Sequence, residues 1–353
     1  TFSDYDNREF QRKRGKHVEV TIKDVARLAG VSISTVSRVI NQKGLVTPEK
    51  ERQVMAAIEQ LHYTPNAIAQ SLKHKKTKLI GMMTSDLSVS FFVGVLQILE
   101  RELLSEGYQI IVANTYDSPE TESKLVDLMA QGRVDLILIN STGGNDERLA
   151  SLQKSGMCFL GYDRYPAHNA FPSVYVDKAD GIYALLAYLY RLGHRKMCFI
   201  SGPPRLSTNA DRRKGVRRFL KDYHLPEDSV LIFEREFSES FAQQIVEQTI
   251  YGENAPTAYI TGSLILAIGI MEFCEAHAIS IPDDISLATF GTFRHDDMVR
   301  PKPLHIADEY AAVADQLLEW IRMVEGDTPV LPTDNRILKP RLIEGDSCAP
   351  PRT

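Results

Sequence analysis

Residues 32–41, close to the N-terminus, carry the side chains with the clearest chemical potential. If a helix begins at Ile33, its inward positions are Val36, Val39 and Ile40. Its outward positions are then Ile33, Ser34, Thr35, Ser37, Arg38 and Asn41. Short hydroxyl and amide groups can approach a phosphate backbone closely, and a guanidinium can pair with guanine through two hydrogen bonds. A helix face that merely meets water more often carries Glu and Lys, so this face favours DNA contact over a plain helical hairpin.

Helix signals on both sides of this stretch would hold it in place. Thr21 and Asp24 form a capping-box pattern at the start of one helix, and Gly30 ends that helix. Ser32 can cap the second helix, so the connection is as short as in a helix-turn-helix. A Thr-Pro pair at residues 47–48 begins a third helix. The pattern predicts an all-α helix-turn-helix headpiece.

The charge of the chain is divided unevenly. Lys and Arg outnumber Asp and Glu by 15 to 8 in residues 1–78, whereas in the remaining residues they are outnumbered by 38 to 26. A basic head on an acidic body is typical of a chain in which only one domain meets a polyanion. The alternative is a chance cluster of solvated lysines, and charge alone does not decide between the two.

The remainder of the chain alternates between apolar runs and amphipathic segments. Strands are expected over residues 78–84, 108–113, 134–140, 157–162, 196–201, 229–233, 256–261 and 285–290, and helices over residues 91–106, 119–131, 146–155, 179–192, 210–222, 238–251 and 264–278. This alternation predicts parallel sheets with helices on both faces. About 270 residues exceed one core, so two doubly wound lobes are expected, with a ligand site in the cleft between them.

Other classes of protein find little support. The sequence has no GxGxxG after a strand, no GxxxxGK[ST], no GxSxG and no HExxH, so an enzyme is not expected. The histidines are scattered and no CxxC pair occurs, so neither a metal site nor a cofactor is expected. No apolar run is long enough for a membrane helix, and the N-terminus has no apolar signal region. These features predict a cytoplasmic protein without a membrane partner.

The run TIKDVARLAGVSISTVSRVIN, residues 21–41, resembles the headpiece of the lactose/galactose-repressor (LacI/GalR) family. The resemblance continues through residue 81 and implies that the second helix enters the major groove of DNA. By position, it implies base contacts from Ile33, Ser34 and Arg38. It implies contacts with the DNA backbone from Thr21, Ser32, Thr35, Ser37, Asn41, Thr47, Tyr63 and Asn66. Because Ile33 and Ser34 read bases poorly, Arg38 is expected to carry most of the direct specificity.

A second Thr-Pro pair, at residues 64–65, begins a segment that resembles the hinge helix of the same family. The resemblance implies that Leu72, beside the small Ala69, wedges into the minor groove. Unstacking a base step costs a few kcal/mol and gives a bent site that contacts more protein. The alternative is that Leu72 is simply a core contact of a short helix.

The body resembles the effector core of that family, which is similar in fold to periplasmic sugar-binding proteins. The matching pieces include YDRY (162–165), TNADRRKGV (208–216) and KPRLIEGDS (339–347). By position, the resemblance implies an effector site made of Asp86, Phe91, Phe92, Asp163, Arg164, Arg212 and Phe237. For Phe91 and Phe92, packing at a helix start is the alternative, and Asp163 could instead cap a loop.

Two positions depart from the family pattern. Leu264 and Gly291 stand where members that bind neutral sugars usually carry Asp. A cleft with fewer carboxylates and several guanidiniums favours an anionic ligand, such as a sugar phosphate. The alternative is a neutral ligand held elsewhere.

Taken together, the sequence predicts a homodimeric transcription regulator that binds a near-palindromic operator on double-stranded DNA and answers to a small molecule. Its expected parts are a flexible basic arm (1–19), the headpiece (20–64), the hinge helix and linker (65–77), the two-lobed core for effector binding and dimerisation (78–347) and a tail (348–353). The alternative from another class is a small-molecule receptor without a DNA function. Recovery of a specific sequence from random DNA would separate the two.

Overall fold

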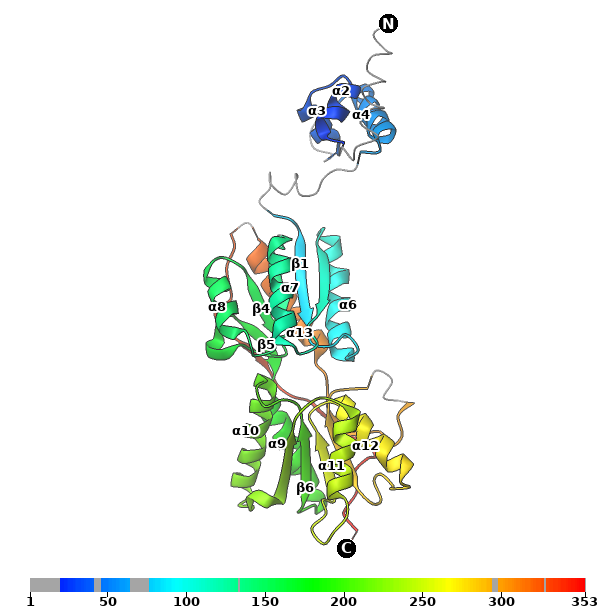
Figure 1. Ribbon diagram of the computed structural model, residues 1–353, viewed down its shortest axis with the longest axis vertical. Helices are drawn as coiled ribbons and strands as arrows, with labels where there is room; N and C mark the ends of the chain where they lie inside the picture. Colours follow the sequence, from blue (N-terminus) through cyan, green and yellow to red (C-terminus); the bar gives the residue numbers. More distant parts are fainter. Residues whose placement is uncertain are drawn as a thin grey trace. The chain divides into compact units, whose positions relative to one another are not determined.

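Three short helices pack around a small apolar centre to form the headpiece (Figure 1). They are α2 (Ile22–Leu28), α3 (Ile33–Ile40) and α4 (Pro48–Leu61). Val25, Val36 and Val54, one from each helix, are completely buried. The inward positions predicted for α3 are confirmed, because Val36 and Val39 are buried and Ile40 packs partly buried against the same cluster.

Polar residues define the ends of these helices. The Asp24 carboxylate accepts hydrogen bonds from the Thr21 backbone N–H at 3.1 Å and from the Thr21 hydroxyl at 2.7 Å. The Ser32 hydroxyl accepts the Thr35 backbone N–H at 3.2 Å. Between the two helices, Gly30 adopts φ +65°, a left-handed conformation that glycine takes without strain. The tight turn predicted between α2 and α3 is thus confirmed, and it fixes which face α3 exposes.

The computed structural model describes residues 20–40, 46–63, 76–132, 134–293, 298–326 and 328–352. The chain divides into two units, Thr1–Thr77 and Lys78–Thr353, of which the second is the core unit. The predicted N-terminal arm and hinge helix lie outside the described residues, as do Asn41, Asn66, Ala69 and Leu72. Across the described parts of the chain, the helices are too short or too polar to traverse a membrane.

The first lobe of the core unit is a sheet of parallel strands in the order β11-β5-β4-β3-β1-β2. Its strands are β1 (Leu79–Thr84), β2 (Gln109–Asn114), β3 (Leu136–Ile139), β4 (Phe159–Tyr162), β5 (Ser173–Val176) and β11 (Arg336–Leu338), and its helices are α6 (Ser90–Ser105), α7 (Pro119–Gln131), α8 (Asp146–Lys154) and α13 (Tyr310–Glu325). Successive strand residues point to opposite faces, so Met82 packs with α6 and α13 while Met83 packs with α7 and α8. Both faces are covered, which explains why these strands read as continuous apolar runs.

The second lobe repeats this plan in the order β12-β10-β9-β8-β6-β7. Its strands are β6 (Met197–Ser201), β7 (Val230–Glu234), β8 (Ala258–Thr261), β9 (Ser286–Phe290), β10 (Leu304–Ile306) and β12 (Leu342–Ile343), and its helices are α9 (Lys178–Leu192), α10 (Ser207–Asp222), α11 (Glu239–Thr249) and α12 (Leu264–Ala276). Only the short edge strand β12 runs antiparallel among the described pairs. Two doubly wound lobes, as predicted, are confirmed.

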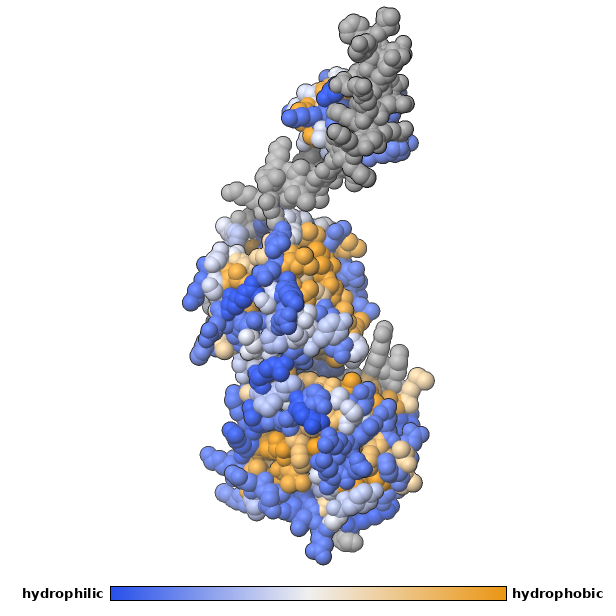
Figure 2. All heavy atoms as spheres, viewed as in Figure 1, coloured by the Kyte–Doolittle hydropathy of each residue, from blue (hydrophilic) through white to orange (hydrophobic). Residues whose placement is uncertain are grey.

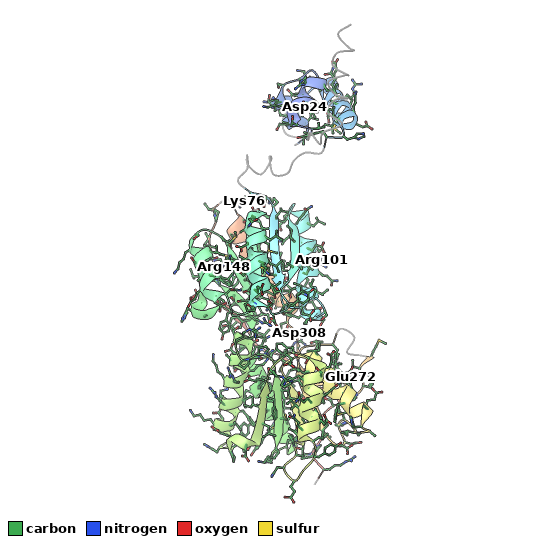
Figure 3. The ribbon with its side chains drawn as sticks, viewed as in Figure 1. Asp24, Lys76, Arg101, Arg148, Glu272 and Asp308 are labelled. Carbon is green, nitrogen blue, oxygen red and sulfur yellow. The ribbon has the colours of Figure 1, made fainter. Side chains whose placement is uncertain are left out.

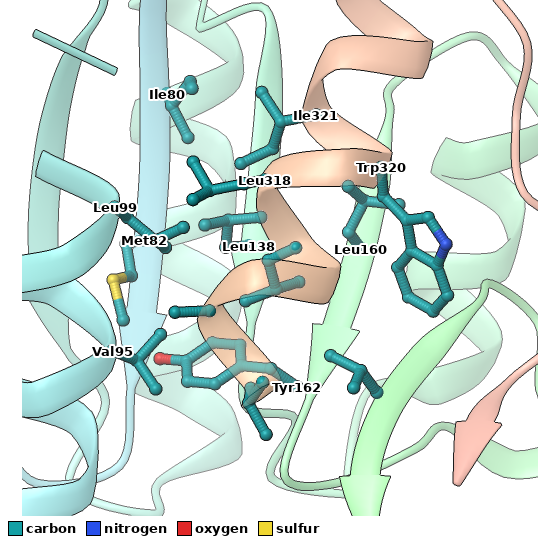
Figure 4. Packing of buried hydrophobic residues seen from close by; sticks show 14 of the residues in the cluster. Ile80, Met82, Val95, Leu99, Leu138, Leu160, Tyr162, Leu318, Trp320 and Ile321 are labelled. Atoms are coloured by element: carbon teal, nitrogen blue, oxygen red, sulfur yellow. The ribbon is translucent and has the colours of Figure 1, made fainter. Parts of the chain in front are cut away.

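The chain crosses between the lobes three times, and nothing in the sequence predicted these crossings. It leaves the first lobe after β5, returns after β10 through α13, and links β11 to β12 through residues 339–341. Helix α13 buries Leu318, Trp320 and Ile321 in the core of the first lobe (Figure 4). The expected alternation ended at residue 290, because the strands after it have only two or three residues, too few to show a periodic pattern.

Candidate functional site

The exposed face of α3 brings together most of the predicted DNA-contact residues. Ser32, Ile33, Ser34 and Arg38 are exposed, and Thr35 and Ser37 are half-buried. The Ser32 hydroxyl lies 2.8 Å from the Ser34 hydroxyl and 2.9 Å from that of Thr35. These three hydroxyls satisfy one another at the start of α3, where an incoming acceptor such as a phosphate oxygen can replace one of the bonds.

The other described headpiece candidates lie at helix ends. Thr21 and Thr47 are exposed at the N-caps of α2 and α4. Tyr63 is half-buried against the headpiece core, and its backbone N–H donates to the Ile58 carbonyl at 3.0 Å, just beyond α4. Packing fixes where the tyrosine ring lies. The Thr21 hydroxyl is bonded to Asp24, and that of Thr47 makes no cap bond.

The core unit contains a cavity of about 710 Å³ lined by both lobes. All seven predicted effector-site residues line it: Asp86, Phe91, Phe92, Asp163, Arg164, Arg212 and Phe237. The cavity lies at the carboxyl ends of strands such as β1, β4 and β9, where doubly wound sheets place ligands. Asp308, at the crossing from β10 to α13, lies where the two lobes meet (Figure 3).

Two first-lobe aromatics form part of this lining while belonging to the core. Phe91 and Phe92 are 7% and 3% exposed, and their rings meet edge to face at 5.3 Å between centroids. Phe92 also meets the buried ring of Tyr162 at 5.9 Å. Packing at the start of α6 therefore fixes both rings, and what they offer the cavity is a rigid apolar surface.

Arg164 is held by its own lobe. Its two terminal nitrogens donate to the two carboxylate oxygens of Asp117, at 2.5 and 3.2 Å, and one of them also donates to the Ser141 carbonyl at 3.2 Å. The side chain is 5% exposed. Both terminal nitrogens are therefore engaged, and among the described residues only its Nε lacks a hydrogen-bond partner.

A buried ion pair spans the two lobes beside the cavity. The Lys178 ammonium lies 3.0 Å from the Asp163 carboxylate, which also accepts the Asn140 amide at 3.2 Å. Burial opposes ionisation of Asp163, but the nearby charges of Lys178 and Arg164 outweigh it and hold the pKa of this carboxyl below its ordinary value. The pair therefore stays charged, and it joins the end of β4 to the start of α9.

Arg212 lies on α10 with its stem buried and 6% of the residue exposed. One terminal nitrogen donates to the Asn209 amide oxygen at 2.6 Å, and the guanidinium stands over the Phe290 ring at 5.3 Å. Among the described residues its Nε atom has no hydrogen-bond partner. Burial lowers the pKa of the guanidinium to about 10, with Asp163 opposing the change. Arg212 is thus a buried cation with donor capacity to spare.

Asp308 was not among the predicted site residues, yet it lies at the centre of the cavity wall. Its carboxylate accepts the Thr292 backbone N–H at 3.0 Å and lies near Gly291. Burial raises the pKa of this carboxyl to about 6, against the opposing effects of Thr292 and Lys178. The Asp308 carboxylate, which follows β10, thus lies close to Gly291, where the family pattern would place an Asp.

The two departures from the family pattern meet on the second-lobe wall. A Cβ at Gly291 would lie 3.1 Å from Leu264 Cγ, and the φ of this glycine is +108°. A side chain at residue 291 would therefore be strained as well as crowded. The Phe237 ring lies directly against the backbone of Gly202, since a Cβ at this glycine would lie 2.2 Å from the ring. At both glycines, a neighbouring side chain occupies the space that a Cβ would need.

Direct bonds between the lobes close one side of the cavity. Arg205, after β6, donates to the backbone carbonyls of Asp117 at 2.6 Å and Thr142 at 3.3 Å. The Tyr165 hydroxyl, after β4, donates to the Asp211 carboxylate on α10 at 2.9 Å. These bonds break if the lobes separate, so they favour the closed arrangement described here.

Five charged residues of the cavity lining were not predicted from the sequence: Asp117, Lys178, Arg205, Glu236 and Asp308. Lys178 begins a helix directly after a strand, which is the only local signal that it carries. Asp117 and Asp308 follow strand ends, and their roles depend on partners 47 and 16 residues away. Pairing over such distances leaves no periodic mark in the sequence.

Comparison with known proteins adds independent findings. Residues 21–66 match the family described as "Bacterial regulatory proteins, lacI family", and residues 77–334 match "Periplasmic binding proteins and sugar binding domain of LacI family". The HTH-type transcriptional repressor PurR of Klebsiella pneumoniae (strain 342) is 32% identical over 277 residues, which are 78% of this chain and 81% of that protein. Catabolite control protein A of Priestia megaterium is 30% identical over 325 residues, 91% of this chain and 98% of that protein.

Solved structures show the same fold. A lac repressor dimer bound to operator and the anti-inducer ONPF superposes with a TM-score of 0.79 and 23% identity, covering 94% of this chain and all of that one. The Cra transcriptional dual regulator from Pseudomonas putida, in complex with fructose 1-phosphate, has a TM-score of 0.66 and 24% identity, covering 76% and 98% of the two chains.

Proposed function

The chain belongs to the LacI family of bacterial regulatory proteins, and from this premise we propose how its two units act. It is a DNA-binding transcriptional repressor with an effector-binding core, and its curated relatives are regulators rather than enzymes. We propose that α3 reads base pairs in the major groove, with Arg38 as the principal reader. An operator-binding protein acts where the chromosome is, which supports the cytoplasmic location predicted from the sequence.

One observation carries the DNA proposal. Helix α3 buries Val36 and Val39 completely or nearly so, and this packing turns Arg38 and the hydroxyls of Ser32 and Ser34 outward together. The hydroxyls can hold the helix on the phosphate backbone, while the guanidinium reaches a guanine edge. Ile33, 45% exposed at the start of the helix, offers an apolar contact such as a thymine methyl would meet.

We propose that two copies of the chain act together on a near-palindromic site. One headpiece covers too few base pairs for useful specificity, so a dimer is required. The core unit exposes apolar side chains that a second copy could cover, including Leu104, Ile111 and Leu128 of the first lobe. Apolar surface is visible on the first lobe in Figure 2. Strand β2, which carries Ile111, is an edge strand of its sheet.

We further propose that a small anion in the cavity changes operator affinity. The carboxylates of Asp117 and Asp163 are each paired with a cation, whereas no carboxylate among the described residues pairs with Arg212. The lining also carries the carboxylates of Asp86, Glu236 and Asp308, so the proposal rests on the guanidinium of Arg212 and not on an excess of positive charge. This guanidinium would hold the anion, of which a sugar phosphate is one kind. The fructose 1-phosphate of the Cra complex belongs to that protein, and at 24% identity the likeness supports the fold alone.

Selection from random DNA tests the first part. Wild-type protein should enrich a near-palindrome, and Arg38→Ala should lose about 1–3 kcal/mol of discrimination per subunit while keeping weak, salt-sensitive binding. Arg52→Ala is the matched control, because Arg52 is an exposed arginine on α4 that also belongs to the headpiece. Equal enrichment profiles for wild type and Arg38→Ala would reject the assignment of Arg38.

The effector proposal is tested separately on the recovered operator. Glucose 6-phosphate and glucose differ only by the phosphate, so an anion site should prefer the ester, and Arg212→Ala should remove that preference. Fluorescence anisotropy of labelled operator measures both operator affinity and its response to each compound. A response to glucose that exceeds the response to its phosphate would exclude the anion and leave the DNA function standing.

A further inference from the structure

The second-lobe wall of the cavity is apolar over a continuous stretch. Helix α12 begins at this wall and contributes Leu264, Ile265 and Ile268. Phe290, at the end of β9, and Phe293, just beyond it, also line the cavity. The side chains come from two neighbouring strand ends, β8 and β9, so they form one surface rather than scattered contacts.

Such a surface discriminates strongly between kinds of ligand body. Leu264 and Gly291 lie against each other, so neither position offers a polar atom from its side chain. A polyhydroxylated ring pressed against the side chains of Leu264, Ile265 and Ile268 would find no hydrogen-bond partner on them, and Asp308, beside Gly291, is the polar side chain that borders this surface. A flat apolar ring would instead gain free energy from the apolar surface that it removes from water. The wall therefore favours an apolar body.

The polar end of the cavity lies where α12 begins. A Cβ at Gly262 would lie 3.4 Å from Arg212 Cδ, so the Arg212 stem passes directly against the residue before the N-cap of α12. Ser263, the N-cap, makes no side-chain cap bond, and its hydroxyl has no partner among the described residues. Arg212 and the start of α12 both line the cavity, so the guanidinium and the first-turn N–H groups border the same part of it.

We propose that the effector is an amphipathic anion. Its phosphate or carboxylate head is held by Arg212 and the N-terminus of α12, and its flat apolar body rests on Leu264, Ile265 and Ile268. This proposal rests on the proposed function, because it assumes that the effector binds in the cavity. It favours anions with an apolar body over sugar phosphates. Leu264 is then the residue that sets specificity for the body of the ligand.

Calorimetry with two phosphate esters tests the proposal on the full-length protein. Phenyl phosphate and glucose 6-phosphate share the head and differ in the body, and inorganic phosphate measures the head alone. Phenyl phosphate should bind at least tenfold more tightly than glucose 6-phosphate. Arg212→Ala should weaken both esters by tenfold or more, because it removes the contact that they share.

Substitutions of Leu264 distinguish recognition of the ligand's apolar body from recognition of its negative charge. Leu264→Asn adds polar atoms without charge and should cut the preference for phenyl phosphate by at least tenfold. Leu264→Asp should cut it further, since its carboxylate also repels the head. Leu331→Asp is the control, because Leu331 is 50% exposed and outside the cavity lining.

Three results would overturn the proposal: tighter binding of glucose 6-phosphate than of phenyl phosphate, no binding of either ester, or a ratio unchanged by Leu264→Asn. Operator binding, followed by anisotropy in the same samples, reports on the DNA function independently. Failure of the ligand proposal is therefore distinguishable from failure of the regulator.

Discussion

Arg38 in the headpiece and Arg212 in the core unit are both proposed to hold a ligand, yet their surroundings are opposite. Arg38 stands exposed on a short helix, whereas Arg212 is 6% exposed and stacked over Phe290. The headpiece rests on a small apolar cluster, and the core unit on four larger ones. The two proposals thus place a polyanion against side chains that are exposed to water, and a small ligand against side chains that are already buried.

Ion pairs extend the same comparison to stability. Lys196–Asp228 and Lys178–Asp163 have similar lengths, 2.6 and 3.0 Å, but the first pair is exposed and the second is buried. An exposed pair contributes about 0–1 kcal/mol, whereas removing one partner of a buried pair costs about 3–5 kcal/mol. Surroundings, rather than distance, decide what each pair contributes.

The largest expected effect follows from breaking the buried pair. Asp163→Asn leaves the Lys178 ammonium buried without its counter-ion, and it should destabilise the core unit by about 3–5 kcal/mol. The left-handed backbone of residue 163, with φ +61°, tolerates asparagine, so strain does not contribute. Urea denaturation followed by the fluorescence of Trp320, the single tryptophan of the chain, measures the loss.

Asp228→Asn is the matched control for that measurement, and it should leave the unfolding free energy nearly unchanged, because water screens the exposed pair. Equal effects of the two substitutions would mean that burial does not separate these pairs. The proposed difference between exposed and buried ion pairs would then be wrong for the core unit.

Replacing Asp308 should have the opposite effect on stability to replacing Asp163. Its pKa is raised to about 6 in the folded protein from an ordinary value of 3.8, so folding favours the protonated form. The carboxyl therefore costs up to about 3 kcal/mol of stability above pH 6, and this cost shrinks as the pH falls from about 6 to 4. Asp308→Asn should stabilise the core unit at pH 7.5 and much less at pH 4.5.

Thermal unfolding of wild type and variant at the two pH values tests this prediction. Asp315→Asn, at an exposed position on α13, is the control and should show no comparable dependence on pH. A constant difference between wild type and Asp308→Asn across the range would contradict the raised pKa.

The smallest expected effect belongs to the headpiece. Asp24→Ala removes the carboxylate that accepts from Thr21, at a cost of about 1 kcal/mol. Amide hydrogen exchange in the intact chain should be about fivefold faster in α2 to α4, with the core unit unchanged. Lys23→Ala, at an exposed position of the same turn, is the control. Unchanged exchange in α2 would show that the cap contributes nothing.

The headpiece was readable because its signals are local. The helix starts are marked by residues in or next to the first turn, namely Thr21, Ser32 and Pro48. The cavity was readable only in part. Its seven predicted residues came from a resemblance, and Lys178 and Asp308 were missed because their roles arise from contacts between elements. Strands as short as β10 and β12 carry too few residues for a pattern, so the crossings between lobes were missed as well.

Those crossings set the order in which the protein can be completed during synthesis. The first lobe needs α13 and β11, whose residues 310–338 are translated after almost all of the second lobe. While the ribosome makes residues 177–306, the sheet of the first lobe lacks an edge strand, and the apolar surface that α13 covers is open. Nascent chains therefore pass through a long interval in which a chaperone can bind that surface, although its helices and most of its strands have already been made.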